Sequence, residues 1–441
     1  MTTTAVPDDA METADASAGA AVSARRSRWF DVLLIVLLMA AHATVVWHRL
    51  SAIPPVVTSR GTIDSYFHAD VVRVVENMTD RESDRAKSAV HPLFRLIAYP
   101  LPKLMVKLLH VSPLTAVHLQ QSAVAGLWAA AFYGVLRLAR CRWYDALLFT
   151  VLVCVSAAAL MWFAVPETFP YGSLTILLGL LAVAWFGERP VREAWLVAAG
   201  VLTFSITVTN GMVGGVWTVL KSRWPRFVQV LVNTFFVAAL LWGVSRHFFK
   251  NTEFFLAVTA ESSHVMDDRS GGVLDKAAAF LAHGVVMPRV EQYPHHRRDD
   301  FPIMSVQRSA PGSASWWGRA GVAAWAIVLG CGVWMLVLRR ERSTVWLVIG
   351  LSALGQFALH LIYGDETFLA ALHFTPLLIL VGAYACTTPI APVARTAAAV
   401  LVVCAVLNNL PVLRQVTGYY QAGGKIDAPV LPSPRESTAR R

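Results

Sequence analysis

The sequence predicts an all-α protein, a polytopic bundle of about 9–11 transmembrane helices, from apolar runs of membrane-spanning length. Of its 441 residues, 56% are hydrophobic and only 15% are charged, and the mean hydropathy is +0.53. Soluble domains carry about 25% charged residues, so a soluble core could not absorb this much apolar surface. Lipid can absorb it, because each apolar run of about 20 residues satisfies its own backbone hydrogen bonds as a helix.

The predicted bundle occupies residues 29–413 and follows a tail, 1–28, that is rich in Ala, Thr, Ser and Asp and is expected to be disordered and cytosolic. Segment 195–220 is interrupted by Thr209-Asn210-Gly211, which favours a pair of short half-helices that enter and leave on the cytoplasmic side. Full membrane helices are expected at 29–47, 114–138, 144–164, 171–187, 226–248, 317–338, 344–363, 368–386 and 394–413.

Charge in the connecting loops indicates the orientation of this bundle. Basic clusters lie in alternate short loops, as the positive-inside rule requires of cytoplasmic loops: Arg137/Arg140/Arg142, Arg189/Arg192, Lys221/Arg223/Arg226 and Arg339/Arg340/Arg342. The sequence therefore predicts a bacterial inner-membrane protein with a cytoplasmic N-terminus. Two large loops, 49–113 and 249–316, would lie outside, and so would the C-terminal tail, 414–441.

The first large outer loop has the pattern of amphipathic helices rather than of a disordered segment. Apolar residues recur at helical spacing through 61–111 and are interrupted by Pro100 and Pro102. Such helices lie along the membrane interface, so this loop is expected to form a roof over the bundle.

Candidate site residues begin in the same loop, in the run from Gly61 to Asp70. Asp64 follows the first membrane helix closely, and a carboxylate that is half-desolvated there has the raised pKa that suits a general base. His68 and Asp70 are candidate substrate-binding residues. His91, directly before Pro92, could hold a phosphate oxygen. Helix capping, packing or a surface position explains each of these residues equally simply.

Short outer turns hold the remaining acidic candidates. Glu167 joins two long apolar helices and must lie at the bilayer boundary, where an ionisable group is a functional candidate. Asp365 and Glu366 occupy an equally short turn, with His360 and His373 within about two helical turns on either side. Helix capping is the alternative for Glu167, and His373 fits a hydrogen bond to another helix better than a metal ligand.

The second large outer loop carries cations against the positive-inside trend, among them Arg289 and Arg298. A guanidinium group matches the paired oxygens of a phosphate, so these residues are candidates for a lipid phosphate. Contact with lipid headgroups is the simpler alternative. The sequence contains no P-loop, dinucleotide-binding, HExxH, GxSxG or haem motif in a supporting context, which argues against ATP- or NAD-driven chemistry.

This layout resembles the GT-C superfamily of membrane glycosyltransferases that use polyprenyl-phosphate-linked sugars. The shared features are an acid directly after the first membrane helix, interfacial helices behind it, short acidic outer turns and a second large outer loop. The resemblance implies that Asp64 is the general base and that the donor is a polyprenyl-phosphate sugar. It also implies a glycan or lipid acceptor and contact with membrane lipids; a nucleic-acid partner is not expected.

The sequence departs from the pattern of the family at one point. Some members have paired acids such as DxD, whereas here Asp70 is six residues from Asp64. No cofactor is predicted, and a divalent metal, although conceivable, is not predicted either. Two alternatives remain open: an O-antigen ligase or polymerase, which would rely on an Arg/His-rich outer loop without an essential acid, and a transporter or flippase, for which the Thr209-Asn210 break is the one supporting feature.

Overall fold

The computed structural model describes residues 8–59, 64–83, 87–255, 271–293, 301–339 and 343–423, with side chains from residue 29 onward. The predicted all-α bundle is confirmed, and the described part contains one two-stranded sheet. Seven described segments are long and apolar enough to cross a membrane, which makes this a multi-pass membrane protein: Trp29–Ala52, Phe169–Phe186, Trp224–Phe248, Trp316–Leu338, Thr344–Ile362, Thr367–Thr387 and Ala391–Gln421.

The helices follow the order expected from the apolar runs. The first outer loop carries α2 (Val71–Thr79), α3 (Phe94–Ala98) and α4 (Pro100–Leu109), after α1 (Asp8–Ala52). The rest of the bundle consists of α5 (Pro113–Leu138), α6 (Trp143–Val155), α7 (Ala157–Trp162), α8 (Phe169–Phe186), α9 (Glu193–Phe204), α10 (Met212–Lys221), α11 (Trp224–Phe248), α12 (Val273–Ala278), α13 (Trp316–Leu338), α14 (Thr344–Ile362), α15 (Ala371–Tyr384) and α16 (Ala391–Gln421).

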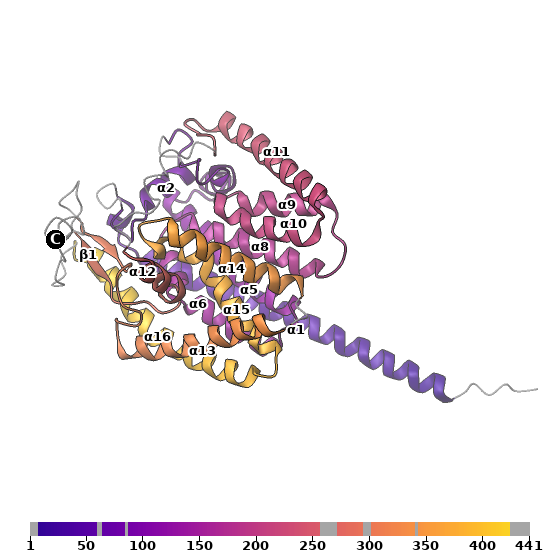
Figure 1. Ribbon diagram of the computed structural model, residues 1–441. Helices are drawn as coiled ribbons and strands as arrows, with labels where there is room; N and C mark the ends of the chain where they lie inside the picture. The colour runs from indigo at the N-terminus through magenta and orange to yellow at the C-terminus, as the bar shows by residue number, and fades with distance from the viewer. Residues whose placement is uncertain are drawn as a thin grey trace, which may run out of the picture.

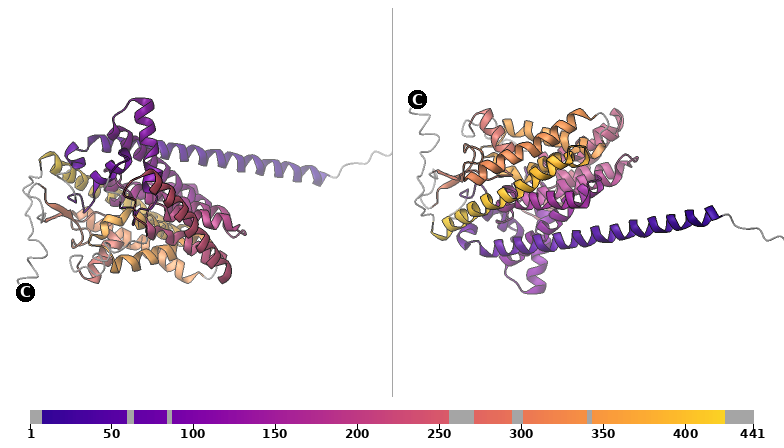
Figure 2. Two further views of the ribbon diagram at one scale, coloured as in Figure 1. Left: turned by 90° about the horizontal axis from the view of Figure 1, so that it is seen from above. Right: turned by 90° about the horizontal axis from the view of Figure 1, so that it is seen from below.

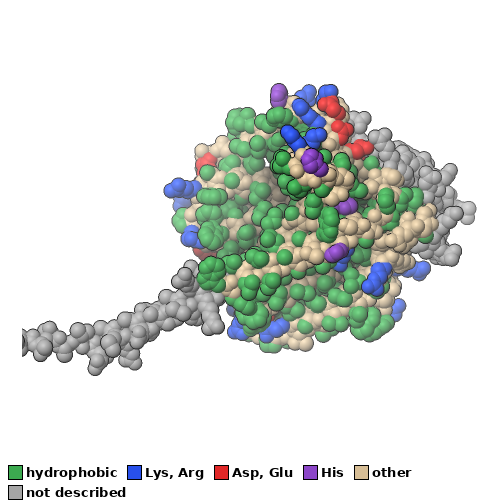
Figure 3. Space-filling view, turned by 180° about the vertical axis from the view of Figure 1, so that it is seen from behind, with side chains coloured by type: hydrophobic (Ala, Val, Ile, Leu, Met, Phe, Trp, Pro, Cys, Tyr) green, Lys and Arg blue, Asp and Glu red, His purple; other side chains and the backbone are tan. Residues whose placement is uncertain are grey.

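The elements of loops 49–113 and 249–316, which the sequence predicts to lie outside and which keep the name outer loops here, gather at one end of the bundle. In Figure 1, α2, α12 and β1 (Glu291–Tyr293) lie at the end opposite the projecting N-terminal part of α1, and both views of Figure 2 show the same separation. Strand β1 pairs antiparallel with β2 (Ile303–Ser305). Figure 3 shows apolar side chains over most of one face, with charged side chains toward its ends, as expected for a protein surrounded by lipid.

Helix α4 has the amphipathic character predicted for the first outer loop. Leu104, Leu108 and Leu109 are 50%, 62% and 60% exposed, whereas Pro102 is buried. An apolar face of this size that stays exposed among the described residues fits a helix that lies against lipid.

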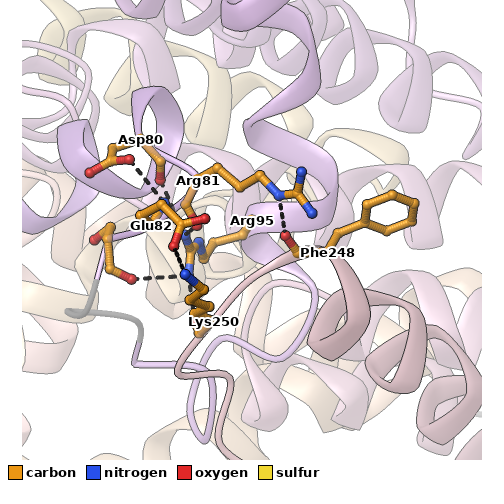
Figure 4. Close-up of polar contacts among 7 residues, drawn as sticks. Asp80, Arg81, Glu82, Arg95, Phe248 and Lys250 are labelled. Carbon is orange, nitrogen blue, oxygen red and sulfur yellow. Dashed lines mark hydrogen bonds and ion pairs between the residues drawn. The ribbon is translucent and has the colours of Figure 1, made fainter.

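One arginine fastens the first outer loop to the end of α11. Arg95, only 4% exposed, lies 4.5 Å from the centre of the Phe249 ring and donates to four backbone carbonyls. These carbonyls belong to Asp80, Arg81, Ser83 and Lys250, at 3.1, 2.8, 3.3 and 3.1 Å (Figure 4). Because its guanidinium is occupied by hydrogen bonds to these backbone carbonyls, Arg95 has a structural role.

The helix expected at 144–164 is broken into α6 and α7. Ser156 is extended, with φ −61° and ψ 152°, and its Oγ accepts a hydrogen bond from the N–H of Ala159. The freed N–H groups of Ala157 and Ala158 donate to the carbonyls of Val285 and Gly284, at 3.1 and 2.8 Å. The break therefore arises because the second outer loop inserts a buried segment, residues 284–287, beside α7.

Asn409 of α16 satisfies this inserted backbone. Its Nδ2 donates to the carbonyls of Val155 and Val285, at 3.0 and 2.9 Å, and its Oδ1 accepts from the N–H of Met287 at 2.9 Å. Irregular backbone at membrane depth is tolerated only where such partners exist, so Asn409 is a main support of the inserted segment.

The C-terminal helix is longer than the sequence predicts. Helix α16 was expected to end near residue 413 but continues to Gln421. The added turns bury Val416, Tyr419 and Tyr420, at 2%, 0% and 2% exposure. The helix continues because these side chains pack against the outer loops instead of extending into a free tail.

Candidate active site

The loop from Asp64 to Asp70 has an unusual backbone. Asp64, Phe67 and His68 have φ angles of 65°, 48° and 64°, in the left-handed region that non-glycine residues seldom occupy. The loop is held there by Phe67, which is fully buried against Trp162 and Phe368 at ring distances of 6.3 and 5.3 Å. Local strain of this kind concentrates at functional sites, where the surrounding structure enforces it.

Two distant elements also hold this loop. The hydroxyl of Ser65 lies 3.1 Å from the hydroxyl of Tyr420 at the end of α16, and the N–H of Met304 in β2 donates to the Ser65 carbonyl at 2.9 Å. Asp64 and His68, on either side of this anchored stretch, are half-buried. The Asp64 carboxylate is thus carried on a loop whose conformation depends on both large outer loops and on the C-terminal helix.

Asp70 begins α2 and holds Arg73. Its side chain caps the helix by accepting from the N–H of Arg73 at 3.3 Å, and its second oxygen forms an ion pair with the Arg73 Nε at 3.3 Å. Arg73 is 5% exposed. Helix capping, the alternative considered for these acids, therefore applies to Asp70. The ion pair of Asp70 also holds the buried guanidinium of Arg73 beside the loop.

Glu167 lies within electrostatic reach of Arg73. Its carboxylate is 1% exposed and accepts from the N–H and hydroxyl of Thr168, at 2.6 and 3.2 Å. Burial raises the pKa of Glu167 and the negative charge of Asp70 adds to this, while Arg73 and the Thr168 hydrogen bonds oppose it. Arg73 thus lies within electrostatic reach of two carboxylates from separate outer loops.

His91 approaches the same guanidinium from the segment before α3. Its Nδ1 lies 2.8 Å from the carbonyl of Ile206, to which it donates. Burial lowers the pKa of His91 to about 3, and the positive charges of Arg73 and Lys87 lower it further, while the Ile206 bond opposes them. The ring is therefore neutral, with the proton on Nδ1. The role predicted for His91 in holding a phosphate oxygen remains a prediction.

We refer to Asp70, Arg73, His91 and Glu167 as the Arg73 cluster. Arg73, Lys87 and His91 line a narrow cavity between α2 and the end of α11. On the other side of the segment that follows His91 lies a groove of about 830 Å³ between α3, α9 and α11. Its wall is mostly apolar: Leu93, Leu96, Ile97, Ala194, Val197, Ala198, Val201, Leu202, Phe236, Val237 and Leu241.

The break predicted at Thr209-Asn210-Gly211 borders this region. Helices α9 and α10 are both short, and the turn between them forms two hydrogen bonds with the His91 segment. The N–H of Leu93 donates to the carbonyl of Ser205 at 2.9 Å, and the N–H of Val208 donates to the carbonyl of Val90 at 3.2 Å. The predicted half-helix pair is therefore present, and its turn supports the wall between the cavity and the groove.

Glu366 has a different environment. Its Oε2 accepts from the Ser305 hydroxyl and from the N–H of Val306, at 2.5 and 3.3 Å, and the N–H of Thr367 donates to Gln307 at 2.7 Å. Burial raises the pKa of Glu366 to about 7, although these hydrogen bonds favour the ionised carboxylate and oppose the rise. The described contacts thus connect Glu366 to the hairpin of the second outer loop and not to the Arg73 cluster.

Replacing Glu366 by glutamine is expected to remove a pH-dependent loss of stability. The folded protein keeps the proton between pH 4.5 and about 7 whereas the unfolded chain releases it, so ionisation costs stability as the pH rises through this window. The difference is up to about 3 kcal/mol. The melting temperatures of both proteins are measured from pH 4.5 to 8. The melting temperature of the wild type should fall relative to that of Glu366→Gln as the pH rises. A constant difference between the two melting temperatures would contradict this.

The remaining predicted residues belong to the Glu366 turn and to the second outer loop. Asp365 is half-buried in the same turn as Glu366. Arg289 is exposed, and its backbone is held by the hydroxyls of Ser313 and Ser309, at 3.0 and 2.6 Å. Arg298 lies outside the described residues. Their predicted roles therefore remain predictions.

Sequence reasoning missed Arg73. The available signal was its position three residues after the N-cap acid Asp70, within a run of valines on the inner face of α2. In the described part of the chain, no group of three or more His, Cys, Asp and Glu side chains could hold a metal. The counter-charge to Asp70 is instead the Arg73 guanidinium.

Comparison with solved structures identifies the fold. The chain resembles the crystal structure of ArnT from Cupriavidus metallidurans bound to undecaprenyl phosphate, with a TM-score of 0.55, 11% identity, and coverage of 88% of this chain and 77% of ArnT. The oligosaccharyltransferase of Archaeoglobus fulgidus aligns at a TM-score of 0.48 and 12% identity, over 90% of this chain and 57% of its own. No family model and no curated protein matches the chain. The chain therefore has the fold of ArnT, which is the fold that the GT-C resemblance predicts.

Proposed function

We propose that this protein is a glycosyltransferase that moves a sugar from a polyprenyl-phosphate donor to an acceptor at the outer face of the bacterial inner membrane. The observation that carries the proposal is the Arg73 cluster, which lies beside an apolar groove within a GT-C fold. A lipid-linked donor needs this combination, because its chain stays in lipid while its phosphate and sugar react at the surface.

The groove between α3, α9 and α11 takes the isoprenoid chain. Its volume of about 830 Å³ and its aliphatic wall suit a branched hydrocarbon, since each buried methylene group contributes about 0.8 kcal/mol. In this proposal the phosphate is met by Arg73 and Lys87, which line the cavity on the other side of the segment that follows His91. A guanidinium can donate two parallel hydrogen bonds to the phosphate and stabilise the charge that develops as the phosphate leaves.

Asp64 serves as the general base. The carboxylate takes the proton of the acceptor hydroxyl while the acceptor oxygen attacks the anomeric carbon from the side opposite the phosphate. The bond between the anomeric carbon and the phosphate oxygen breaks, the polyprenyl phosphate leaves, and the configuration at this carbon inverts. Glu167, whose pKa is raised by burial, is suited to hold sugar hydroxyls beside Arg73.

The test is sugar transfer by the purified protein in nanodiscs, supplied with radiolabelled polyprenyl-phosphate sugars and an extract of membrane lipids and glycans. Asp64→Asn keeps the size of the side chain and removes the base, so transfer should fall by about 100-fold while the melting temperature is unchanged. Glu76→Gln, a half-buried acid of α2 outside the Arg73 cluster, is the matched control and should transfer at the wild-type rate.

Two results would change the proposal. Transfer that is normal in Asp64→Asn but lost in Glu167→Gln would move the base to Glu167 and keep the enzyme class. Absence of transfer by the wild type, combined with movement of labelled lipid across the bilayer, would replace the enzyme with a flippase.

A further inference from the structure

One buried carboxylate joins the turn before α15 to the hairpin of the second outer loop. Glu366 is 4% exposed, and its Oε2 accepts hydrogen bonds from the Ser305 hydroxyl and the Val306 N–H, at 2.5 and 3.3 Å. The same hydroxyl oxygen accepts from the N–H of Gln307 at 3.1 Å. The Ser305 hydroxyl therefore uses both its donor and an acceptor position, which fixes the end of β2 against the turn.

The neighbouring residue of β2 holds the loop that carries Asp64. The N–H of Met304 donates to the carbonyl of Ser65 at 2.9 Å, and Ser65 directly follows Asp64 in the chain. Because Met304 and Ser305 are consecutive, the Glu366 carboxylate and the Asp64 loop are hydrogen-bonded to adjacent positions of one strand. A shift of Ser305 is therefore expected to displace the Asp64 loop as well.

A ring contact joins the same two segments a second time. Phe368, two residues after Glu366, packs against Phe67 of the Asp64 loop at a ring distance of 5.3 Å, and both side chains are fully buried. The Phe368 carbonyl accepts from Nε1 of Trp162 at 2.9 Å. The turn that carries Glu366 is thus packed directly against the Asp64 loop, in addition to its contact with the hairpin.

The conformation of the Asp64 loop depends on such outside contacts. The positive φ angles of three of its residues persist only where the surrounding structure enforces them. Inside the loop, the N–H of His68 donates to the Asp64 carbonyl at 3.1 Å. The N–H of Ala69 donates to the Tyr66 carbonyl at 2.8 Å. Loss of an outside contact is therefore expected to weaken both of these hydrogen bonds.

We propose that Glu366 is a positioning residue, which holds the Asp64 carboxylate in place for transfer through Ser305 and Met304. This step rests on the proposed function, in which Asp64 is the general base. A base must lie within hydrogen-bonding distance of the proton that it takes, and a displacement of about 1 Å at a reacting group can cost about 100-fold in rate. Glu366 is buried against the hairpin, so it acts on the loop and not on the substrates.

The first test is sugar transfer in nanodiscs, with kcat and KM measured for the polyprenyl-phosphate donor. Ser305→Ala removes the hydroxyl and Glu366→Ala removes its acceptor, so each should lower kcat by about 10-fold or more and leave KM within about 2-fold. Glu366→Gln keeps an accepting oxygen and should restore most of the kcat that Glu366→Ala loses. The matched control is Glu291→Ala on β1, since Glu291 accepts from the Tyr293 hydroxyl at 2.6 Å within its own strand; its kcat should equal that of the wild type.

Combination with Asp64→Asn separates positioning from a general effect on the fold. If Glu366 acts through Asp64, Glu366→Ala should lower the residual rate of Asp64→Asn by less than about 3-fold, because the base that it positions is already absent. An equal fold-loss in both backgrounds would overturn the proposal, and so would a raised donor KM with an unchanged kcat. Equal losses of kcat in Glu291→Ala and Glu366→Ala would also overturn it, since both acids would then act only by holding the hairpin.

Hydrogen exchange of residues 64–70, followed by mass spectrometry of the full chain, tests the link without any transfer. Ser305→Ala should raise the exchange of the His68 and Ala69 amides, whereas Glu291→Ala should exchange as the wild type does. Unchanged exchange in Ser305→Ala would overturn the positioning role, whatever the transfer assay shows. Faster exchange in Ser305→Ala alongside a wild type that transfers no sugar would support the link between Glu366 and the loop and refute the proposed enzyme.

Discussion

Arg73→Met is expected to reduce sugar transfer by about 1000-fold, because it removes the guanidinium that meets the leaving phosphate. Arg73 is 5% exposed, forms an ion pair with Asp70 and lies within electrostatic reach of Glu167. Its charge therefore acts in a site with little water, where one hydrogen-bond donor is worth most to a transition state. The measurement is kcat and KM for the polyprenyl-phosphate donor, with the acceptor in excess.

Two further variants separate charge from geometry. Arg73→Lys keeps the charge but loses the paired hydrogen bonds, so its kcat should lie between those of the wild type and Arg73→Met. Arg81→Met removes an exposed arginine just beyond α2, whose Nε donates to the Phe248 carbonyl at 2.6 Å, and its kcat should stay within about 3-fold of the wild type. Equal losses in Arg73→Met and Arg81→Met would show that Arg73 acts only on the fold of the loop.

Asn409→Leu is expected to lower the free energy of unfolding by about 3–5 kcal/mol, since it leaves the carbonyl of Val155 and the N–H of Met287 without partners. The leucine side chain has nearly the same volume, so the loss comes from buried polar groups and not from a cavity. The measurement is equilibrium unfolding in mixed micelles of detergent and SDS.

The matched control is Asn233→Leu on α11. Asn233 is half-buried at the groove between α3, α9 and α11, and its Nδ2 donates to the carboxylate of Glu193 at 2.6 Å. The expected loss is about 1 kcal/mol, the net value of one such bond. Equal losses in the two variants would mean that Asn409 is not a special support of the inserted segment 284–287.

The sequence by itself determined the fold class and the presence of acids in short turns at helix ends. Membrane helices are specified by local composition, because each one satisfies its backbone alone, and basic loops orient them. Short connections then place Glu167 and Glu366 at helix ends, and a capping acid such as Asp70 is adjacent in the sequence to the helix that it caps. These features depend on residues that are close together in the sequence.

Only the tertiary structure decided which of these acids share a site. Arg73 lies near Glu167 because separate outer loops pack together, and the Asp64 loop is held through Ser65 by Tyr420, 355 residues away. The break after α6 has the same kind of cause, since Asn409 reaches Val155 across 254 residues. Such contacts leave no local pattern in the chain, because a buried polar group can find its partner at any separation in sequence.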